Sequence, residues 1–183
     1  MKEPWGIDTP WKNSVAFFTY LRGCLRKAWS TNPIKHNLIK KKRKQIPNPN
    51  PKGKKETVFG FTCEMCNTDH VIANGQVDHK VAAGSLRKTS DIQGFVERLL
   101  YVTEDDLRLI CKGCNSALAY ADKQGITYEA AVKEKMLISI CKAKKDIQFL
   151  RDRGITPASN AAKRKAQVRE VLENDLTNPE SPD

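Results

Sequence analysis

Two Cys-x-x-Cys pairs are the residues of this chain whose types and spacing point most directly to chemistry. Cys63 and Cys66 form one pair, and Cys111 and Cys114 form the other. Zinc prefers four thiolate ligands in a tetrahedron, and each pair can present two sulfurs to one ion from a single tight turn. The N-terminus lacks the apolar core of a secretory signal, so we expect a reducing compartment, where such pairs bind metal more often than they form disulfides. The cysteines therefore predict one structural Zn²⁺ site.

A second set of polar side chains, Asp78, His79 and Asn115, lies close to the cysteine pairs in the sequence. Asp78 and His79 fall between the pairs, and Asn115 directly follows Cys114. Carboxylate and amide oxygens suit Mg²⁺ or Mn²⁺, and a neutral imidazole can accept a proton from water. These groups could together hydrolyse a phosphodiester bond. Taken singly, each also fits an ordinary role, such as a helix cap for Asn115.

The strand geometry sets a condition on that chemistry. Neighbouring side chains on a strand face opposite ways, so Asp78 and His79 can converge on one phosphate only if their strand ends or twists there. The residues from Lys80 to Gly84 would allow such a change of direction. We therefore expect the strand to end near His79.

The net charge of +11 is carried by one segment. Twelve of the 32 basic residues lie between Arg22 and Lys55, which contains no Asp or Glu, and the other 20 are balanced by 21 acidic residues. Such a concentration favours a polyanion, nucleic acid before an acidic membrane surface, over a merely solvated tether. No apolar run is long enough to cross a bilayer. We expect DNA phosphates to be contacted by Arg22, Arg26, Lys40, Lys41, Lys42, Arg43, Lys44, Lys52, Lys54 and Lys55.

The apolar periodicity predicts a mostly helical chain around the cysteine-rich stretch. Thr9 and Pro10 signal the start of the first helix, and Thr127 signals the start of the clearest one. Ser90 can cap a short helix that buries Phe95 and Leu99. The remaining pattern predicts helices over 10–29, 34–44, 115–123, 128–152 and 161–174, and strands over 58–61 and 107–110.

The composition divides the chain into five parts. We expect an N-terminal helical arm over 1–34, a basic, Pro-rich and extended linker over 35–57, a zinc-stapled core over 58–125, a C-terminal helical region over 126–176 and a disordered tail over 177–183. The helix over 128–152 carries an apolar stripe. That stripe could form the seam of a homodimer, or it could pack against the helix over 10–29 or the helix over 161–174.

The order Cys-x-x-Cys, Asp-His and Cys-x-x-Cys-Asn resembles the zinc-containing branch of the HNH, or ββα-metal, endonucleases, and the related phage resolvases of the endonuclease VII type. The runs Leu21-Arg22-Gly23 and Gly94-Phe95-Val96 are similar to uncharacterised phage proteins of that family. The resemblance covers about residues 10–170. It implies an α+β, mostly helical fold with a small zinc-stapled ββα-metal core, flanked by an N-terminal helix and two or three C-terminal helices.

The resemblance also implies a role for each site residue. His79 would be the general base, Asp78 and Asn115 would hold the catalytic Mg²⁺ or Mn²⁺, and the cysteines would hold Zn²⁺ away from the chemistry. The family's central Asn, which braces the loop of the catalytic His, corresponds here to Asp106, and an Asp could still accept bracing hydrogen bonds. The proline often found after Asp-His and the lysine often found after the last ligand are absent.

The function implied by the resemblance is a phage-encoded, metal-dependent DNA endonuclease of homing or genome-processing type, working in the cytoplasm of an infected bacterial cell. One alternative is a resolvase that cuts branched DNA, such as a Holliday junction, as a dimer. Another is a zinc-stabilised DNA-binding protein whose nuclease site has decayed, which the departures at Asp106 and at the missing lysine permit. Double-stranded or branched DNA is the partner in each case.

Overall fold

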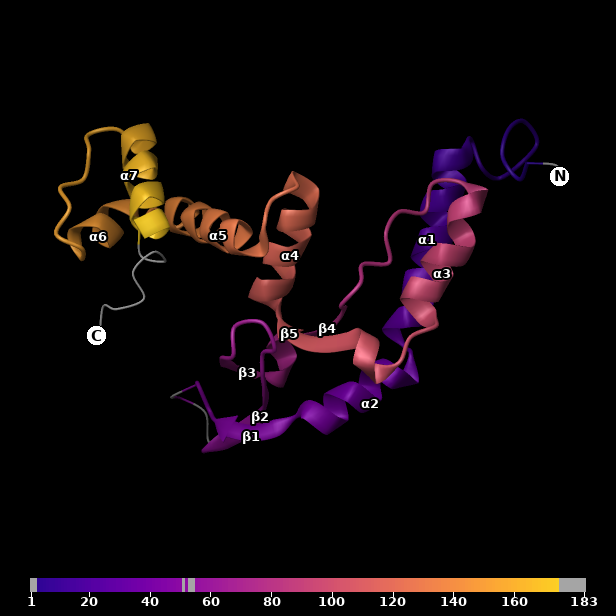
Figure 1. Cartoon of the computed structure of the whole chain (residues 1–183), viewed down its shortest axis with the longest axis horizontal. Coiled ribbons are helices and arrows are strands. Elements are labelled where there is room, and N and C mark those ends of the chain that lie inside the picture. Colours follow the sequence, from indigo (N-terminus) through magenta and orange to yellow (C-terminus); the bar gives the residue numbers. More distant parts are fainter. Residues whose placement is uncertain (1–2, 51, 53–54, 175–183) are drawn as a thin grey trace. The chain divides into compact units, whose positions relative to one another are not determined.

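The chain folds into two compact units, Met1–Lys112 and Gly113–Asp183, in a computed structural model that describes residues 3–50, 52 and 55–174. Seven α-helices and two small sheets occur in the described residues, so the protein is α+β and mostly helical, as predicted (Figure 1). The division between the units falls inside the region 58–125, which the sequence predicted to be a single core. None of the described helices is both long and apolar enough to span a bilayer.

The first helix begins later than its sequence signals predicted. Helix α1 spans Ser14–Ser30, and the Asn13 side chain caps it by accepting the N–H of Ala16 at 3.0 Å. Thr9 is not the cap, because its hydroxyl donates to the Gly6 carbonyl in a preceding turn. Helix α1 buries Phe18 and Trp29 and packs beside α3 (Figure 1).

The segment 35–57 is not the extended linker that its prolines predicted. Helix α2 (Pro33–Lys42) starts after the Asn32 cap and buries Leu38, and strand β1 (Lys44–Pro47) buries Ile46. Strand β1 pairs antiparallel with β2 (Thr57–Thr62). The prolines end the strand, but these two apolar side chains anchor the basic segment to the first unit.

Two sheets frame the cysteine-rich stretch. Strands β1, β2 and β3 (Asp69–Val71) form one sheet in that order, and β4 (Gly75–His79) pairs with β5 (Leu107–Cys111) to form the other. In the β4–β5 register Asp78 lies opposite Arg108, and His79 lies opposite Leu107. The strands expected over 58–61 and 107–110 are therefore confirmed.

Between β4 and β5 the chain makes the predicted helical excursion. Helix α3 (Ile92–Leu100) buries Phe95 and Leu99, as expected. The short 3₁₀ turns of the first unit lie at Ile72–Asn74 (η1), Thr89–Asp91 (η2) and Glu104–Asp106 (η3).

The second unit is helical, and its longest predicted helix is broken. Helix α4 (Lys112–Gln124) is followed by α5 (Tyr128–Lys142), whose Thr127 cap accepts the Ala130 N–H at 3.2 Å. Helices α6 (Asp146–Arg151) and α7 (Ala161–Asn174) follow. The helix predicted over 128–152 is wrong, because Lys144 adopts a left-handed φ of 54° between α5 and α6.

The break changes the role of the apolar stripe. Leu137 of α5 and Leu150 of α6 form a buried cluster with Val168 and Leu172 of α7. Packing against the last helix is thus confirmed, and the break at Lys144 means that the stripe does not run along one straight helix over 128–152. The tail predicted over 177–183 lies outside the described residues.

Candidate metal centre and histidine pocket

The four cysteines of the two pairs gather at one point. Their Sγ atoms all lie within 4.8 Å of one another, and three of the four residues are buried while Cys66 is exposed. A tetrahedral zinc ion with Zn–S bonds of about 2.3 Å would hold its sulfurs about 3.8 Å apart, so the donor set and spacing fit Zn²⁺. Across the part of the chain that the structure describes, this is the one such cluster of three or more His, Cys, Asp or Glu ligands.

The backbone around Cys63 favours its thiolate form. Burial alone would raise the pKa of the Cys63 thiol, but hydrogen bonds from the backbone N–H groups of Cys66, Cys111 and Met65 outweigh burial and lower it to about 7. The bond from Cys111 N to Cys63 Sγ measures 3.2 Å. Zinc binds thiolates rather than thiols, so the fold prepares this sulfur for a metal ion.

His70 adds a hydrogen-bond donor beside the cysteine cluster. Its Nε2 lies 3.7 Å from Cys66 Sγ, and its Nδ1 lies 3.3 Å from the amide nitrogen of Asn74. The amide nitrogen can only donate, so Nδ1 accepts and Nε2 carries the hydrogen that points to the sulfur. The sequence motifs did not assign this contact, although the four-residue spacing from Cys66 was a usable signal.

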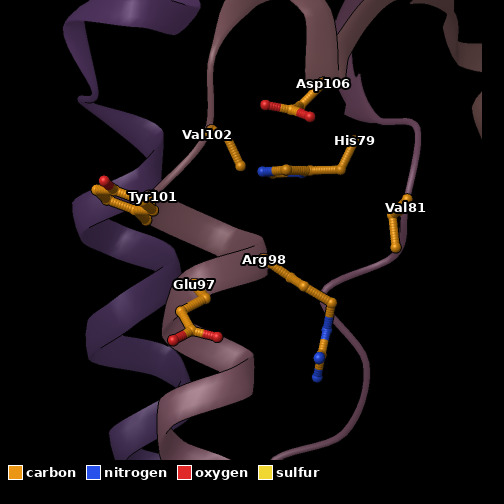
Figure 2. Close-up of a pocket in the computed structure, with 7 residues that line it drawn as sticks. All are labelled: His79, Val81, Glu97, Arg98, Tyr101, Val102 and Asp106. Atoms are coloured by element: carbon orange, nitrogen blue, oxygen red, sulfur yellow. The ribbon is translucent and has the colours of Figure 1, made fainter.

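His79 faces a pocket at the end of β4. The pocket has a volume of about 300 Å³ and is lined by His79, Val81, Glu97, Arg98, Tyr101, Val102 and Asp106 (Figure 2). The ring packs against Trp29 of α1 with centroids 4.3 Å apart, and its Nε2 lies 3.1 Å from the Leu99 carbonyl oxygen. A carbonyl oxygen can only accept, so Nε2 carries the hydrogen and Nδ1 of the neutral ring keeps a lone pair.

Asp106 lies in the same pocket and touches the chain next to His79. Its carbonyl accepts the Lys80 N–H at 2.8 Å, which braces the residue that follows His79. Its carboxylate accepts the Thr103 N–H at 2.7 Å and the Thr103 hydroxyl at 2.8 Å. These bonds, helped by the charge of Lys80, lower the pKa of Asp106. Figure 2 shows the carboxylate beside the His79 ring, whereas the Arg98 guanidinium points the other way.

Asp78 and His79 do not share one set of neighbours. The Asp78 carboxylate accepts from Nε of Arg108 at 2.9 Å and lies 2.8 Å from its Nη2, and neither residue is among those that line the His79 pocket. The reason is local: β4 stays paired with β5 through His79, so adjacent side chains keep facing opposite ways. Asn115 lies in the first turn of α4, one residue after Cys114.

Part of the positive charge in the basic segment between Arg22 and Lys55 is neutralised by ion pairs within the fold. Lys41 pairs with Glu104 at 2.8 Å, Lys42 with Glu64 at 2.6 Å and Lys44 with Asp69 at 2.8 Å. The Arg43 guanidinium lies 4.7 Å from the centroid of the Phe59 ring. The other expected phosphate contacts, Arg22, Arg26, Lys40, Lys52 and Lys55, are exposed, and Lys54 lies outside the described residues.

Comparisons with known proteins add no identification. No protein-family model, curated protein or solved structure matches the chain significantly. The candidate function therefore depends on the motif pattern between Cys63 and Asn115 and on the surroundings of its side chains.

Proposed function

We propose that the protein is a metal-dependent DNA endonuclease that hydrolyses phosphodiester bonds, with His79 as its general base. The observation that carries the proposal is the environment of the His79 ring. One ring nitrogen is tied to the Leu99 carbonyl, the other keeps a lone pair, and the ionised Asp106 lies in the same pocket. The motif order around His79, which resembles the HNH endonucleases, supports the same assignment.

In this proposal His79 moves the proton and Asp106 stabilises the result. The oxygen of a water molecule attacks phosphorus while Nδ1 of His79 takes its proton, because Nε2 is already protonated. The P–O bond to the leaving 3′ oxygen breaks, and that oxygen takes up a proton from solvent. The imidazolium formed at His79 is stabilised by the negative charge of Asp106, which its bonds to Thr103 keep ionised.

The oxygen donors fit the ions that support phosphodiester hydrolysis. Asp78 offers a carboxylate, and Asn115 would offer an amide oxygen, as the resemblance implies. Mg²⁺ and Mn²⁺ prefer such donors and take only one or two from the protein. When bound, the ion supplies charge stabilisation for the phosphate and the leaving oxygen. The four cysteines would hold a structural Zn²⁺, which contributes to folding rather than to the reaction.

Phosphate contacts from the basic residues would hold DNA without reading its bases. Arg22 and Arg26 on α1 belong to the same helix as Trp29, which packs on the His79 ring. Lys40 and Arg43 are exposed at the end of α2. One site faces one strand, so a monomer would nick duplex DNA. A homodimer could cut both strands, or could act on branched DNA as a resolvase.

One observation favours a second candidate function. Asp78 is engaged by Arg108 and lies apart from the His79 pocket, which is also the arrangement of a site that no longer binds a divalent ion. The alternative is therefore a zinc-stabilised DNA-binding protein whose nuclease site has decayed. It would bind DNA with the same basic residues and leave it uncut.

A nicking assay on supercoiled plasmid separates the two candidates. With Mg²⁺ or Mn²⁺, we expect wild type to nick and His79→Ala to be slower by roughly 100- to 10,000-fold, since the general base is lost. DNA binding by His79→Ala should stay unchanged in a gel-shift titration. His36→Ala, which removes an exposed histidine of α2, serves as the matched control and should nick normally.

Wild type that binds but does not nick would favour the decayed-site alternative. Faster cutting of four-way junctions than of plain duplex would favour the resolvase.

A further inference from the structure

Arg108 holds the Asp78 carboxylate in an unusual way. The two residues face each other across β4 and β5. Nε of Arg108 donates to Oδ2 of Asp78 at 2.9 Å, and Nη2 forms the ion pair with the same oxygen at 2.8 Å. An Arg–carboxylate pair commonly places one N–H on each oxygen. Among the described residues, Oδ1 of Asp78 has no recorded hydrogen-bond donor. The ion pair therefore orients the carboxylate and leaves one oxygen for another ligand.

The third nitrogen of the guanidinium has a poor acceptor. Nη1 of Arg108 lies 3.2 Å from the thioether sulfur of Met65, inside the first cysteine turn. A thioether is a weak acceptor compared with an anionic oxygen. The side chains of Asp78 and Arg108 keep 24% and 20% of their surface exposed, so solutes can reach both. A phosphate oxygen would replace the sulfur as a stronger, charge-assisted partner for Nη1.

We propose that Arg108 is a positioning and phosphate-binding residue of the candidate nuclease site. It holds Oδ2 of Asp78 so that Oδ1 faces the divalent ion, and it turns Nη1 from Met65 to an oxygen of the DNA backbone. The inference rests on the proposed endonuclease function. It also gives the site a cation in place of the lysine that is missing after Asn115.

The proposal has a consequence that a purely structural ion pair would not have. A guanidinium beside Asp78 repels a divalent cation, so Arg108 should weaken ion binding in the absence of DNA. An incoming phosphate brings negative charge that offsets both cations. Ion and DNA should therefore bind cooperatively, each strengthening the affinity for the other.

The test separates ion binding from cleavage. Zinc-loaded wild type, Arg108→Met and Arg108→Lys are titrated with Mn²⁺ without DNA, and free Mn²⁺ is followed by its electron paramagnetic resonance signal. We expect Arg108→Met to bind Mn²⁺ roughly tenfold more tightly, because the repelling charge is gone. In single-turnover nicking the same variant should be at least about 100-fold slower, since positioning and phosphate contact are lost. Arg108→Lys keeps the charge and should recover part of the nicking rate.

The controls separate failure of this inference from failure of the endonuclease proposal. Arg151→Met removes an exposed arginine of the second unit and should bind Mn²⁺ and nick as wild type does. Asp78→Asn should lose Mn²⁺ binding; if it does not, Asp78 is not the ligand and the inference falls. Mn²⁺ affinity that is unchanged or weaker in Arg108→Met overturns the role of Arg108, whether or not wild type nicks. If wild type fails to nick while Arg108→Met binds Mn²⁺ more tightly, the endonuclease proposal and the phosphate-binding role of Arg108 are both overturned. Only the electrostatic effect of Arg108 on ion binding at Asp78 then remains.

Discussion

At the scale of single residues, the roles of two histidines follow from what their ring nitrogens face. His79 has a carbonyl oxygen at Nε2, so its free lone pair is on Nδ1. His70 has the Asn74 amide nitrogen at Nδ1, so its hydrogen is on Nε2 and points to a cysteine sulfur. Two rings of the same type are thus prepared for opposite tasks, one to accept a proton and one to donate a hydrogen bond.

The His70 contact should be measurable as zinc affinity. An N–H donor to a ligating thiolate stabilises its negative charge, and groups that support metal ligands commonly affect affinity measurably. We expect His70→Ala to lower zinc affinity by about tenfold, measured by competition with a chromophoric chelator. His70→Gln, which keeps an N–H donor, should recover part of the loss. Equal zinc affinity in His70→Ala and wild type would show that the contact does not support the metal.

At the scale of elements, an ion pair joins the two helices after the break in the second unit. Arg164 of α7 donates from Nε to Asp146 of α6 at 2.6 Å, and their side chains are only 17% and 13% exposed. The Arg164 guanidinium also donates to the Ala158 carbonyl. Helices α6 and α7 also contribute Leu150, Val168 and Leu172 to the apolar cluster around Leu137, and the ion pair links the start of α6 to the first turn of α7.

The Asp146–Arg164 pair predicts a pH-dependent stability. The Arg164 guanidinium holds the pKa of Asp146 below its ordinary value. The stabilisation is therefore fully present above the unfolded aspartate pKa of about 3.9 and is lost as the pH falls through the lower folded pKa. We expect Asp146→Asn to reduce the free energy of unfolding by about 1–2 kcal/mol at pH 7.

Thermal unfolding followed by circular dichroism checks this expectation. The difference between wild type and Asp146→Asn should shrink as the pH is lowered below the folded pKa of Asp146. Asp122→Asn, an exposed position on α4, makes the same change of net charge and should leave stability nearly unchanged. A difference that stays constant down to acidic pH would rule out ionisation of Asp146 as its cause.

At the scale of the whole molecule, the charge that binds a polyanion is smaller than the basic run suggests. Lys41, Lys42 and Lys44 each contact a carboxylate of the first unit. Such exposed pairs contribute little stability, but they lower the positive potential along α2 and β1. The net charge available to DNA therefore rests more on basic residues that contact no carboxylate in the part of the chain that the structure describes, among them Lys40 and Arg43.

The salt dependence of DNA binding tests that distribution. We expect Lys40→Gln with Arg43→Gln to lower the slope of log affinity against log salt by about 2, since each lost phosphate contact removes about 0.9. Lys163→Gln with Lys165→Gln removes the same charge from exposed positions of α7 and should leave the slope nearly unchanged. Equal loss in both double variants would mean that overall net charge, and not this surface, determines binding. Deleting 35–55 is a poorer test because it also removes the buried Leu38 and Ile46.

The sequence by itself determined the local features, because they depend on neighbours in the chain. The local backbone of each Cys-x-x-Cys turn brings its two sulfurs close together. Thr127 likewise caps α5 by accepting the Ala130 N–H three residues away. The strands around the cysteines and the helix that buries Phe95 could be predicted for the same reason. Local signals also misled where two competed: Asn13, not Thr9, caps α1, and the break at Lys144 lies within a continuous apolar stripe.

Only the tertiary structure decided which side chains meet across long stretches of sequence. The register of β4 against β5 places Arg108 on Asp78, and the return of the chain after α3 places Asp106 beside His79. The lysines of α2 and β1 meet carboxylates brought to them by the same folding. Such pairings depend on strand register and on burial of distant apolar residues, so no spacing within the sequence specifies them. The identity of the candidate base could be read from the motif, whereas its tautomer, its charged neighbour and the partner of Asp78 could not.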